Sequence, residues 1–268
     1  MKITDLPTIT SKDNARLKLA RSVRDGRDRS AMFVEGKRLV SELLRSTLKP
    51  LSVYISDGIQ DRYAELISEL NNNSSGETYV VASRVFDSIS DTENSQGIVV
   101  LAERPEPRDL LAEVSEKSLF VYLKKVNNPS NLGAVIRTAE ASGANGIITS
   151  PGSTDAYMPK SLRASMGSAF RVPVFTNIEL ADAIRSLKGS GIRSIAADIN
   201  GAKSYVEADW QGAGILVLGS EAEGLGSGEL DLVDETVVIP MENGVESLNL
   251  AVSAGIVLFE AKRHRANP

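Results

Sequence analysis

The sequence predicts an α/β protein with two domains, the second built on a parallel β-sheet. Short apolar segments alternate with helical patterns along the whole chain, which is typical of α/β folds. In the second half these segments are nearly continuous runs of apolar residues, as in strands covered on both faces. Arg104-Pro105-Glu106-Pro107 separates the halves, because two prolines resist continuation of a helix or a strand.

The first half is expected to form a small α/β domain. Apolar and basic residues from Ser11 to Arg29 form a pattern typical of an amphipathic helix. Further helices are expected at Lys37–Leu48 and Arg62–Leu70, strands at Val53–Ser56, Tyr79–Val81 and Ile98–Leu101, and a turn or loop at Asn71–Gly76.

The second half repeats the alternation with stronger signals. Its expected strands are Leu119–Leu123, Gly146–Thr149, Val172–Phe175, Ile192–Ala197, Gly214–Leu218 and Thr236–Ile239. Its expected helices are Leu132–Ser142, which Gly143 ends, Leu180–Leu187 and Leu248–Arg263. Ligands of such sheets bind beyond the carboxyl ends of the strands.

Composition excludes several kinds of chemistry. The chain has no cysteine, which excludes disulfides, thiolate metal sites and methylation of a pyrimidine ring carbon through a cysteine nucleophile. The one histidine, His264, is expected in a frayed basic tail, and no carboxylate spacing predicts a metal site. No apolar run approaches the ~18 residues that span a membrane, and the N-terminus lacks a signal-peptide core. We therefore expect a cytoplasmic protein without metal.

The net charge of −5 hides an asymmetry along the chain. Residues 1–50 carry 12 Lys or Arg and 6 Asp or Glu, whereas residues 51–107 carry 3 Lys or Arg and 10 Asp or Glu. A basic N-terminal stretch on an acidic protein indicates either an anion-binding surface or a solvated helix face, and charge alone does not separate these two interpretations.

Three segments at strand ends carry candidate chemistry, and the first is Asn127–Ala139. Ser130 and Asn131 are helix start signals. Helical side chains lean toward the N-terminus, so Arg137 could extend toward the positive end of the helix, where an anion would bind. The alternative is an arginine on a solvated helix face.

The second segment, Leu216–Gly226, joins a strand to a glycine-rich loop. A P-loop would need Lys where Leu225 stands, and a dinucleotide fingerprint would need Gly where Glu229 stands. An acidic loop with Glu221 and Glu223 suits a cationic or hydroxyl-rich ligand better than a polyphosphate.

The third segment, Val238–Val252, runs from a strand through a polar loop into a long helix. Ser247 is a candidate N-cap of that helix. Small residues further along the helix favour close packing against another element.

Together the three segments resemble, in this order, the signature motifs of the SpoU/TrmH-type branch of the SPOUT methyltransferases. The matching residues are Asn131, Gly133, Ala134, Arg137, Thr138 and Ala139; Gly219, Glu221 and Gly224; and Pro240, Met241, Ser247, Leu248 and Asn249. The likeness spans Leu119 to His264. Phe33–Gly36 and Thr92–Ile98 resemble, more loosely, the accessory RNA-binding domain of the rRNA-acting members.

The resemblance implies a deep knot that composition and periodicity would not predict, because knots are rare in proteins. Residues 1–104 would form an N-terminal, ribosomal-protein-like α/β domain that binds RNA, residues 105–117 a linker, and residues 118–268 a SPOUT domain with a deep trefoil knot. Members of the family work as homodimers.

The resemblance also implies S-adenosyl-L-methionine as cofactor and methylation of a ribose 2′-hydroxyl in RNA, with rRNA favoured over tRNA. The cofactor would contact Leu218, Gly219, Ile239, Met241 and Leu248. Arg137 would be catalytic, with Asn131, Glu221, Ser247 and Asn249 around the target nucleotide. Phosphates of the RNA would contact the basic residues Arg16, Lys18, Arg21, Arg24 and Lys37.

The mechanism expected is in-line attack of the ribose oxygen on the sulfonium methyl, accelerated mainly by placement of the two groups. The pKa of arginine, roughly 12 or above, disfavours Arg137 as a literal base, so we expect it to stabilise charge on the oxygen and hold the adjacent phosphate. Alternatives are a non-catalytic RNA-binding protein of this fold, an enzyme acting on a small nucleotide, a tRNA ribose methyltransferase, and methylation of a base nitrogen.

Overall fold

The computed structural model describes residues 6–59 and 61–266. The chain forms two compact units. The first contains residues up to Glu106 together with Tyr157–Arg171, and the second contains Pro107–Ala156 and the residues from Val172 onward. Every helix among the described residues is too short or too polar to cross a lipid bilayer.

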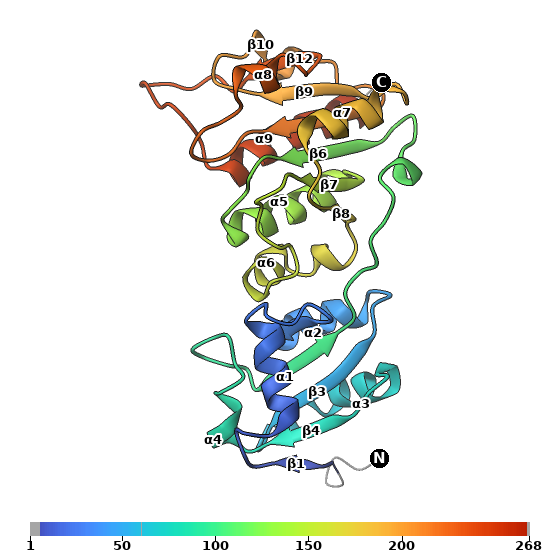
Figure 1. Ribbon diagram of the computed structural model, residues 1–268, viewed down its shortest axis with the longest axis vertical. Helices are drawn as coiled ribbons and strands as arrows, with labels where there is room; N and C mark the ends of the chain where they lie inside the picture. Colours follow the sequence, from blue (N-terminus) through green and yellow to red (C-terminus); the bar gives the residue numbers. More distant parts are fainter. Residues whose placement is uncertain (1–5, 60, 267–268) are drawn as a thin grey trace. The chain divides into compact units, whose positions relative to one another are not determined.

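The first unit is a mixed sheet with helices packed against it (Figure 1). Its strands are β1 (Thr8–Ile9), β2 (Met32–Glu35), β3 (Pro50–Ser56), β4 (Thr78–Val81) and β5 (Ile98–Ala102). In the order β1-β4-β3-β5-β2, the first three strands run parallel to one another, and β5 pairs antiparallel with both β3 and β2. The helices are α1 (Ala15–Arg24), α2 (Lys37–Leu44), α3 (Ala64–Asn73), α4 (Ser83–Phe86) and α6 (Pro159–Ser165).

Helix α1 buries Leu17, Ala20 and Val23 in an apolar core shared with β2, β3, β4 and β5. It is shorter than the expected Ser11–Arg29, because the Asn14 side chain caps its start and the backbone turns after Arg24. The expected loop at Asn71–Gly76 is partly wrong, since α3 continues through Asn73.

The second unit contains a seven-stranded sheet, in the order β10-β12-β9-β11-β6-β7-β8, in which every recorded pairing is parallel. The strands are β6 (Leu119–Leu123), β7 (Gly146–Thr149), β8 (Val174–Phe175), β9 (Arg193–Ala197), β10 (Lys203–Ser204), β11 (Gly214–Leu218) and β12 (Glu235–Val238). The central strands β6 and β11 are buried along their whole length. The predicted fold class is confirmed, whereas the trefoil knot stays a prediction.

Helices cover both faces of this sheet. They are α5 (Pro129–Ser142), α7 (Leu180–Lys188), α8 (Ser227–Leu230) and α9 (Leu250–Ala266). Helix α7 packs Leu180 and Leu187 onto Phe120 and Val217 in one core cluster. Helices α5 and α9 pack on each other and contact β7 and β11, respectively. Because strand side chains alternate between faces, β6 and β11 supply apolar residues to both layers.

Three expectations about helix ends are wrong. The N-cap of α5 is Asn128, whose side chain accepts a hydrogen bond from the Ser130 amide at 2.9 Å, and not Ser130 or Asn131. Helix α9 starts at Leu250, so Ser247 is not its N-cap. His264 lies within α9, 3.1 Å from Glu260, and not in a frayed tail.

Candidate functional site

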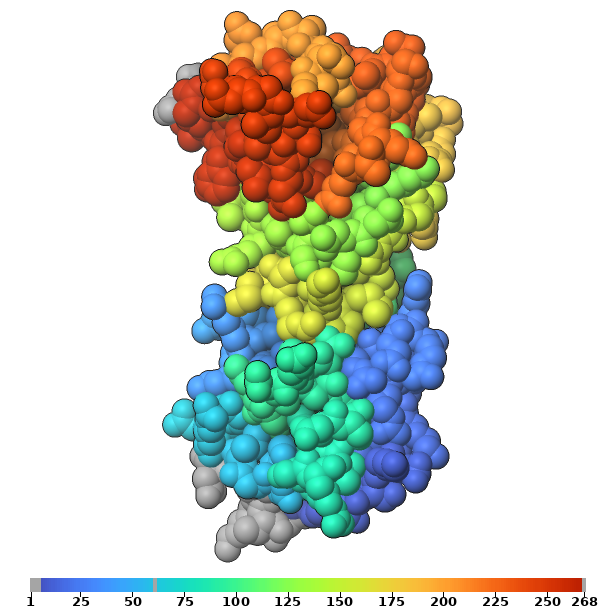
Figure 2. Space-filling model, turned by 90° about the vertical axis from the view of Figure 1, so that its left-hand side faces the viewer, coloured from blue at the N-terminus to red at the C-terminus, as the bar shows by residue number. Residues whose placement is uncertain are grey.

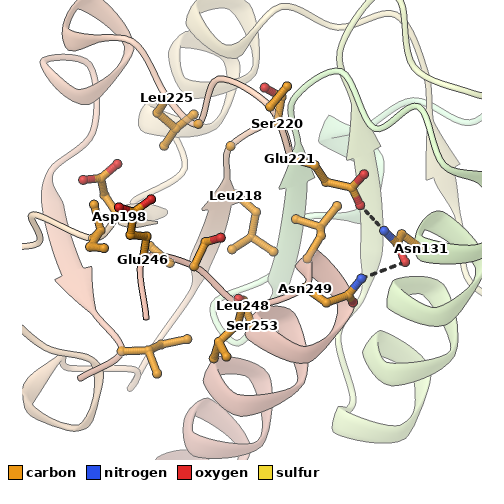
Figure 3. A pocket seen from close by; sticks show the side chains of 18 of the residues that line it. Asn131, Asp198, Leu218, Ser220, Glu221, Leu225, Glu246, Leu248, Asn249 and Ser253 are labelled. Atoms are coloured by element: carbon orange, nitrogen blue, oxygen red, sulfur yellow. Dashed lines mark hydrogen bonds between the residues drawn. The ribbon is translucent and has the colours of Figure 1, made fainter. Parts of the chain in front are cut away.

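Four neighbouring strands of the second sheet, in the order β12-β9-β11-β6, end at the same edge because they are parallel. The residues that follow these strands line one cavity of about 850 Å³ (Figure 3). Its position is where ligands of parallel sheets bind.

The cavity brings together nearly all of the site residues expected from the sequence. The expected cofactor residues that line it are Leu218, Gly219, Ile239, Met241 and Leu248. The expected residues around the nucleotide that line it are Asn131, Glu221, Ser247 and Asn249. They come from three loops far apart in sequence, which the parallel sheet places side by side.

A chain of hydrogen bonds ties these loops together (Figure 3). The Asn249 side-chain amide donates to the Asn131 side-chain oxygen at 3.2 Å, and the Asn131 amide donates to the Glu221 carboxylate. The Asn249 oxygen also accepts from the amide of Ala251 at 2.9 Å, in the first turn of α9. The starts of α5 and α9 and the loop after β11 are therefore positioned by one polar network.

The loop after β11 requires glycine at two places. A Cβ on Gly219 would lie 2.5 Å from the Gly224 carbonyl carbon, so any side chain there would collide with backbone. Gly224 has a φ of +62°, a conformation that L-residues with side chains rarely adopt. The amide of Gly224 donates to the Ser220 carbonyl at 3.0 Å, and the loop folds back on itself over the cavity.

A partly buried ion pair holds the end of this loop. Lys124, directly after β6, has its Nζ 2.5 Å from the Glu229 carboxylate. Glu229 also accepts from the Gly226 amide at 2.7 Å, at the start of α8. No sequence pattern predicted this pair, because Lys124 and Glu229 are far apart in sequence and form no motif.

The cavity is acidic. Its lining includes the carboxylates of Asp198, Glu221 and Glu246 and, within the described part of the chain, no Lys, Arg or His. Figure 3 shows Asp198 and Glu246 on one side and Asn131 and Glu221 on the other, with Leu218 between them. Asp198 and Glu246 were not predicted, although Asp198 directly follows the expected strand Ile192–Ala197.

Arg137 does not line the cavity of its own chain. It lies on α5 with its side chain exposed to solvent. Among the hydrogen bonds and ion pairs of the described residues, none involves its guanidinium. The neighbouring Thr138 faces α9, where a Cβ on Gly255 would lie 3.7 Å from its methyl group. Arg137 is therefore a free cation near the α5–α9 surface.

The expected RNA-contacting residues of the first unit fall into two groups. The first group consists of three arginines that bond within the unit. The guanidinium of Arg16 lies 3.0 Å from the Glu77 carboxylate, and that of Arg21 donates to the Lys12 carbonyl at 2.7 Å. The guanidinium of Arg24 donates to the carbonyls of Ser88 and Ser90 at 3.2 and 3.0 Å. Lys18 and Lys37 are exposed. The ammonium of Lys37 lies 5.8 Å from the ring centre of Tyr63, and the described structure records no partner for the ammonium of Lys18.

The arginines of α1 therefore have structural contacts of their own. Hydrogen bonds from Tyr79 and Arg16 hold the pKa of the Glu77 carboxyl below its ordinary value.

Within residues 6–59 and 61–266, no three His, Asp or Glu side chains gather as a bound metal ion would require.

Comparison with known proteins shows the same two-part organisation. The sequence model of the SpoU rRNA Methylase family matches residues 118–259, and a model described as RNA 2′-O ribose methyltransferase substrate binding matches residues 33–108. RlmP of Bacillus subtilis, a 23S rRNA (guanosine(2553)-2′-O)-methyltransferase, is 26% identical over 233 residues, which cover 87% of this chain and 89% of that protein. RlmB of Neisseria meningitidis, a 23S rRNA (guanosine-2′-O-)-methyltransferase, is 30% identical over 219 residues, which cover 80% of this chain and 88% of that protein.

Solved structures are similar over nearly the whole chain. An AdoMet-bound rRNA methyltransferase from Sinorhizobium meliloti has a TM-score of 0.82 and 30% identity, covering 97% of this chain and 98% of that one. The SpoU methyltransferase AviRb from Streptomyces viridochromogenes, in complex with the cofactor AdoMet, has a TM-score of 0.84 and 28% identity, covering 95% and 99%.

Proposed function

Because this chain belongs to the SpoU rRNA methylase family, we propose that it transfers the methyl group of S-adenosylmethionine to a ribose 2′-hydroxyl of RNA, and that this RNA is rRNA. The observation that carries the proposal is the convergence of three distant loops on one cavity at the carboxyl edge of a parallel sheet. RlmP and RlmB, the two relatives compared by sequence, support rRNA as substrate, since both act on 23S rRNA.

The residues of the cavity fit the cofactor. Leu218, Ile239, Met241 and Leu248 supply apolar surface for an adenine ring, and the carboxylates suit a ligand that carries a sulfonium and an ammonium group. S-adenosylmethionine supplies an activated methyl group. Backbone around Gly219 can approach such a ligand closely, because no side chain stands between them.

In the mechanism that we propose, the protein acts mainly by placement. Asn131, Glu221 and Asn249 form a rigid polar edge of the cavity that can hold the target ribose in line with the methyl group. Arg137 would hold the adjacent phosphate and stabilise the negative charge that develops on the attacking oxygen as the hydroxyl proton passes to solvent water. Since Arg137 lies outside the cavity of its own chain, we propose that it serves the cavity of a second copy.

We propose that the second copy packs against the surface formed by α5 and α9. Val252 and Phe259 lie on α9 two turns apart, and each is about half exposed to solvent, at 50% and 49%. Figure 2 shows α9 (red) and α5 (green) together at the surface of the second unit. A homodimer would cover these apolar side chains.

The first unit would bind RNA. We propose a domain of residues 1–104, a linker of residues 105–117 and a catalytic domain of residues 118–268, with a trefoil knot in the last. The match of residues 33–108 to the substrate-binding model supports this role. Lys18 and Lys37 are exposed and have no recorded ion pair among the described residues, while Arg16, Arg21 and Arg24 also hold the unit together. We also propose a cytoplasmic location, which bacterial relatives that act on 23S rRNA support.

The test is methyl transfer by the purified protein. Protein, labelled S-adenosylmethionine and either rRNA or tRNA are incubated, and the RNA is digested to nucleosides for mass spectrometry. We expect a 2′-O-methylated nucleoside from rRNA. A product from tRNA alone would move the substrate to tRNA, and a methylated base would overturn the ribose assignment. Cofactor binding without any methyl transfer to RNA would favour the non-catalytic alternative.

A further inference from the structure

Asp198 is a charged residue of the cavity for which the mechanism above has no role. It directly follows β9, which lies between β11 and β12 in the sheet, and its side chain lines the cavity. One carboxylate oxygen, Oδ1, accepts a hydrogen bond from the Asn200 amide at 2.9 Å. This bond fixes the orientation of the side chain, and the described residues include no recorded partner for Oδ2, the second oxygen.

The place of Asp198 limits what it can contact. Figure 3 shows it across the cavity from Asn131 and Glu221, beyond Leu218. If the reacting methyl group lies at the Asn131 side, Asp198 faces one of the two arms that leave the sulfonium. These arms are the adenosine and the amino-acid end.

The charges of the cavity favour the adenosine arm. The amino-acid end is a zwitterion, so an ammonium at Asp198 would bring its own carboxylate close to Asp198 and Glu246. Among residues 6–59 and 61–266, no Lys, Arg or His lines the cavity to compensate this repulsion. The ribose diol carries no charge and donates hydrogen bonds, which an ionised carboxylate accepts strongly.

We infer that Asp198 binds the ribose diol of S-adenosylmethionine through its second carboxylate oxygen and so selects a ribonucleoside cofactor. This inference rests on the proposed function, because it assumes that cofactor. It makes Asp198 a binding residue with no part in the proton or methyl transfer.

The experiment is calorimetric binding to the full-length protein, without RNA. The probes are S-adenosylmethionine, S-adenosylhomocysteine, 5′-methylthioadenosine, which lacks the amino-acid end, and the 2′,3′-dideoxy form of 5′-methylthioadenosine. We expect Asp198→Ala to raise the Kd of the first three about tenfold or more, the size of a lost hydrogen bond to a charged group. The dideoxy probe should bind the variant and the unmodified protein equally weakly.

Two further variants separate a direct contact from folding and from charge. Asp198→Asn keeps an oxygen that can accept a hydrogen bond from the Asn200 amide, so this variant should fold normally. Its Kd for the same three ligands should rise less than the Kd of Asp198→Ala. Asp231→Asn removes one negative charge from an exposed side chain directly after α8 that does not line the cavity, and it should leave every Kd unchanged.

The outcomes are distinct. Weaker binding of S-adenosylmethionine and S-adenosylhomocysteine with unchanged binding of 5′-methylthioadenosine would place the amino-acid end at Asp198 and overturn the inference. Unchanged binding of all probes by a folded Asp198→Ala protein would also overturn it. Failure of the unmodified protein to bind S-adenosylmethionine would instead refute the proposed function.

Discussion

The side-chain amide of Asn131 donates a hydrogen bond to the carboxylate of Glu221, ninety residues further along the chain. Asn131 lies in the first turn of α5, and Glu221 lies in the loop after β11. Their contact exists only because β6 and β11 are neighbours in the parallel sheet, which places the ends of both strands together. The proposed catalytic geometry depends on this contact.

Loss of the Asn131 side chain should slow methyl transfer. We expect Asn131→Ala to lower kcat at least about tenfold, because both Glu221 and Asn249 lose a partner that orients them. The Kd of S-adenosylmethionine should change little. Asn127→Ala is the matched control, since Asn127 is exposed near the same helix end and lies outside the cavity lining. Equal activity of the two variants would contradict the role of Asn131.

Removal of the Arg137 cation should cost roughly 10²-fold or more in rate at saturating cofactor, as for other groups that stabilise charge in a transition state. Arg185→Ala, which removes an exposed arginine from α7, is the control. If Arg137 serves the second copy, mixing Arg137→Ala with Asn131→Ala protein should restore activity, because some cavities then receive both residues. A mixture as inactive as its components would contradict action across the dimer.

The ion pair between Lys124 and Glu229 should stabilise the loop after β11. Lys124→Met leaves the Glu229 carboxylate partly buried without its cation, so we expect a loss of about 2 kcal/mol in the free energy of unfolding. The Kd of S-adenosylmethionine should rise as well, because the loop lines the cavity. Denaturant unfolding followed by the fluorescence of the buried Trp210 measures the first effect. The double variant Lys124→Met/Glu229→Met should recover much of the stability, since neither charge remains.

Two cations of α1 should behave differently toward RNA. Lys18→Ala should weaken RNA binding, and the slope of log K against log salt concentration should fall by about 1, as for one lost phosphate contact. Arg24→Ala should instead lower thermal stability, because Arg24 donates to the Ser88 and Ser90 carbonyls. Filter binding over a salt series and thermal unfolding distinguish these effects. An unchanged RNA affinity for Lys18→Ala would remove α1 from the RNA surface.

Acid should weaken the attachment of β12 to β9. Burial raises the pKa of the Asp234 carboxyl, but hydrogen bonds from the amide and hydroxyl of Ser194 outweigh this effect, so the pKa lies below its ordinary value. The stability from these bonds is therefore present above the unfolded pKa, near 4, and is lost as pH falls through the folded pKa. We expect Asp234→Asn to destabilise the protein at pH 7 and to destabilise it less at pH 3. Equal destabilisation at both values of pH would refute this assignment.

The sequence alone determined the alternation of strands and helices, and therefore the α/β class. Local patterns were sufficient there: apolar runs such as Leu119–Leu123 and Gly214–Leu218 coincide with β6 and β11. The motif residues around Asn131, Glu221 and Asn249 were also visible, because glycines and polar residues follow buried strands. Helix starts were less predictable, because several capping residues stand in a row before α5 and only backbone geometry selects Asn128 among them.

Only the tertiary structure decided which distant residues meet. The strand order β12-β9-β11-β6 brings Asp198 into the same cavity as Asn131, and no local pattern of one strand encodes its neighbours in a sheet. Packing likewise decides that Lys124 meets Glu229. The spacing of the arginines of α1 indicated a cationic surface, but their side chains bond to other parts of the first unit. Side-chain chemistry is local, but the partner of a charge is set by packing.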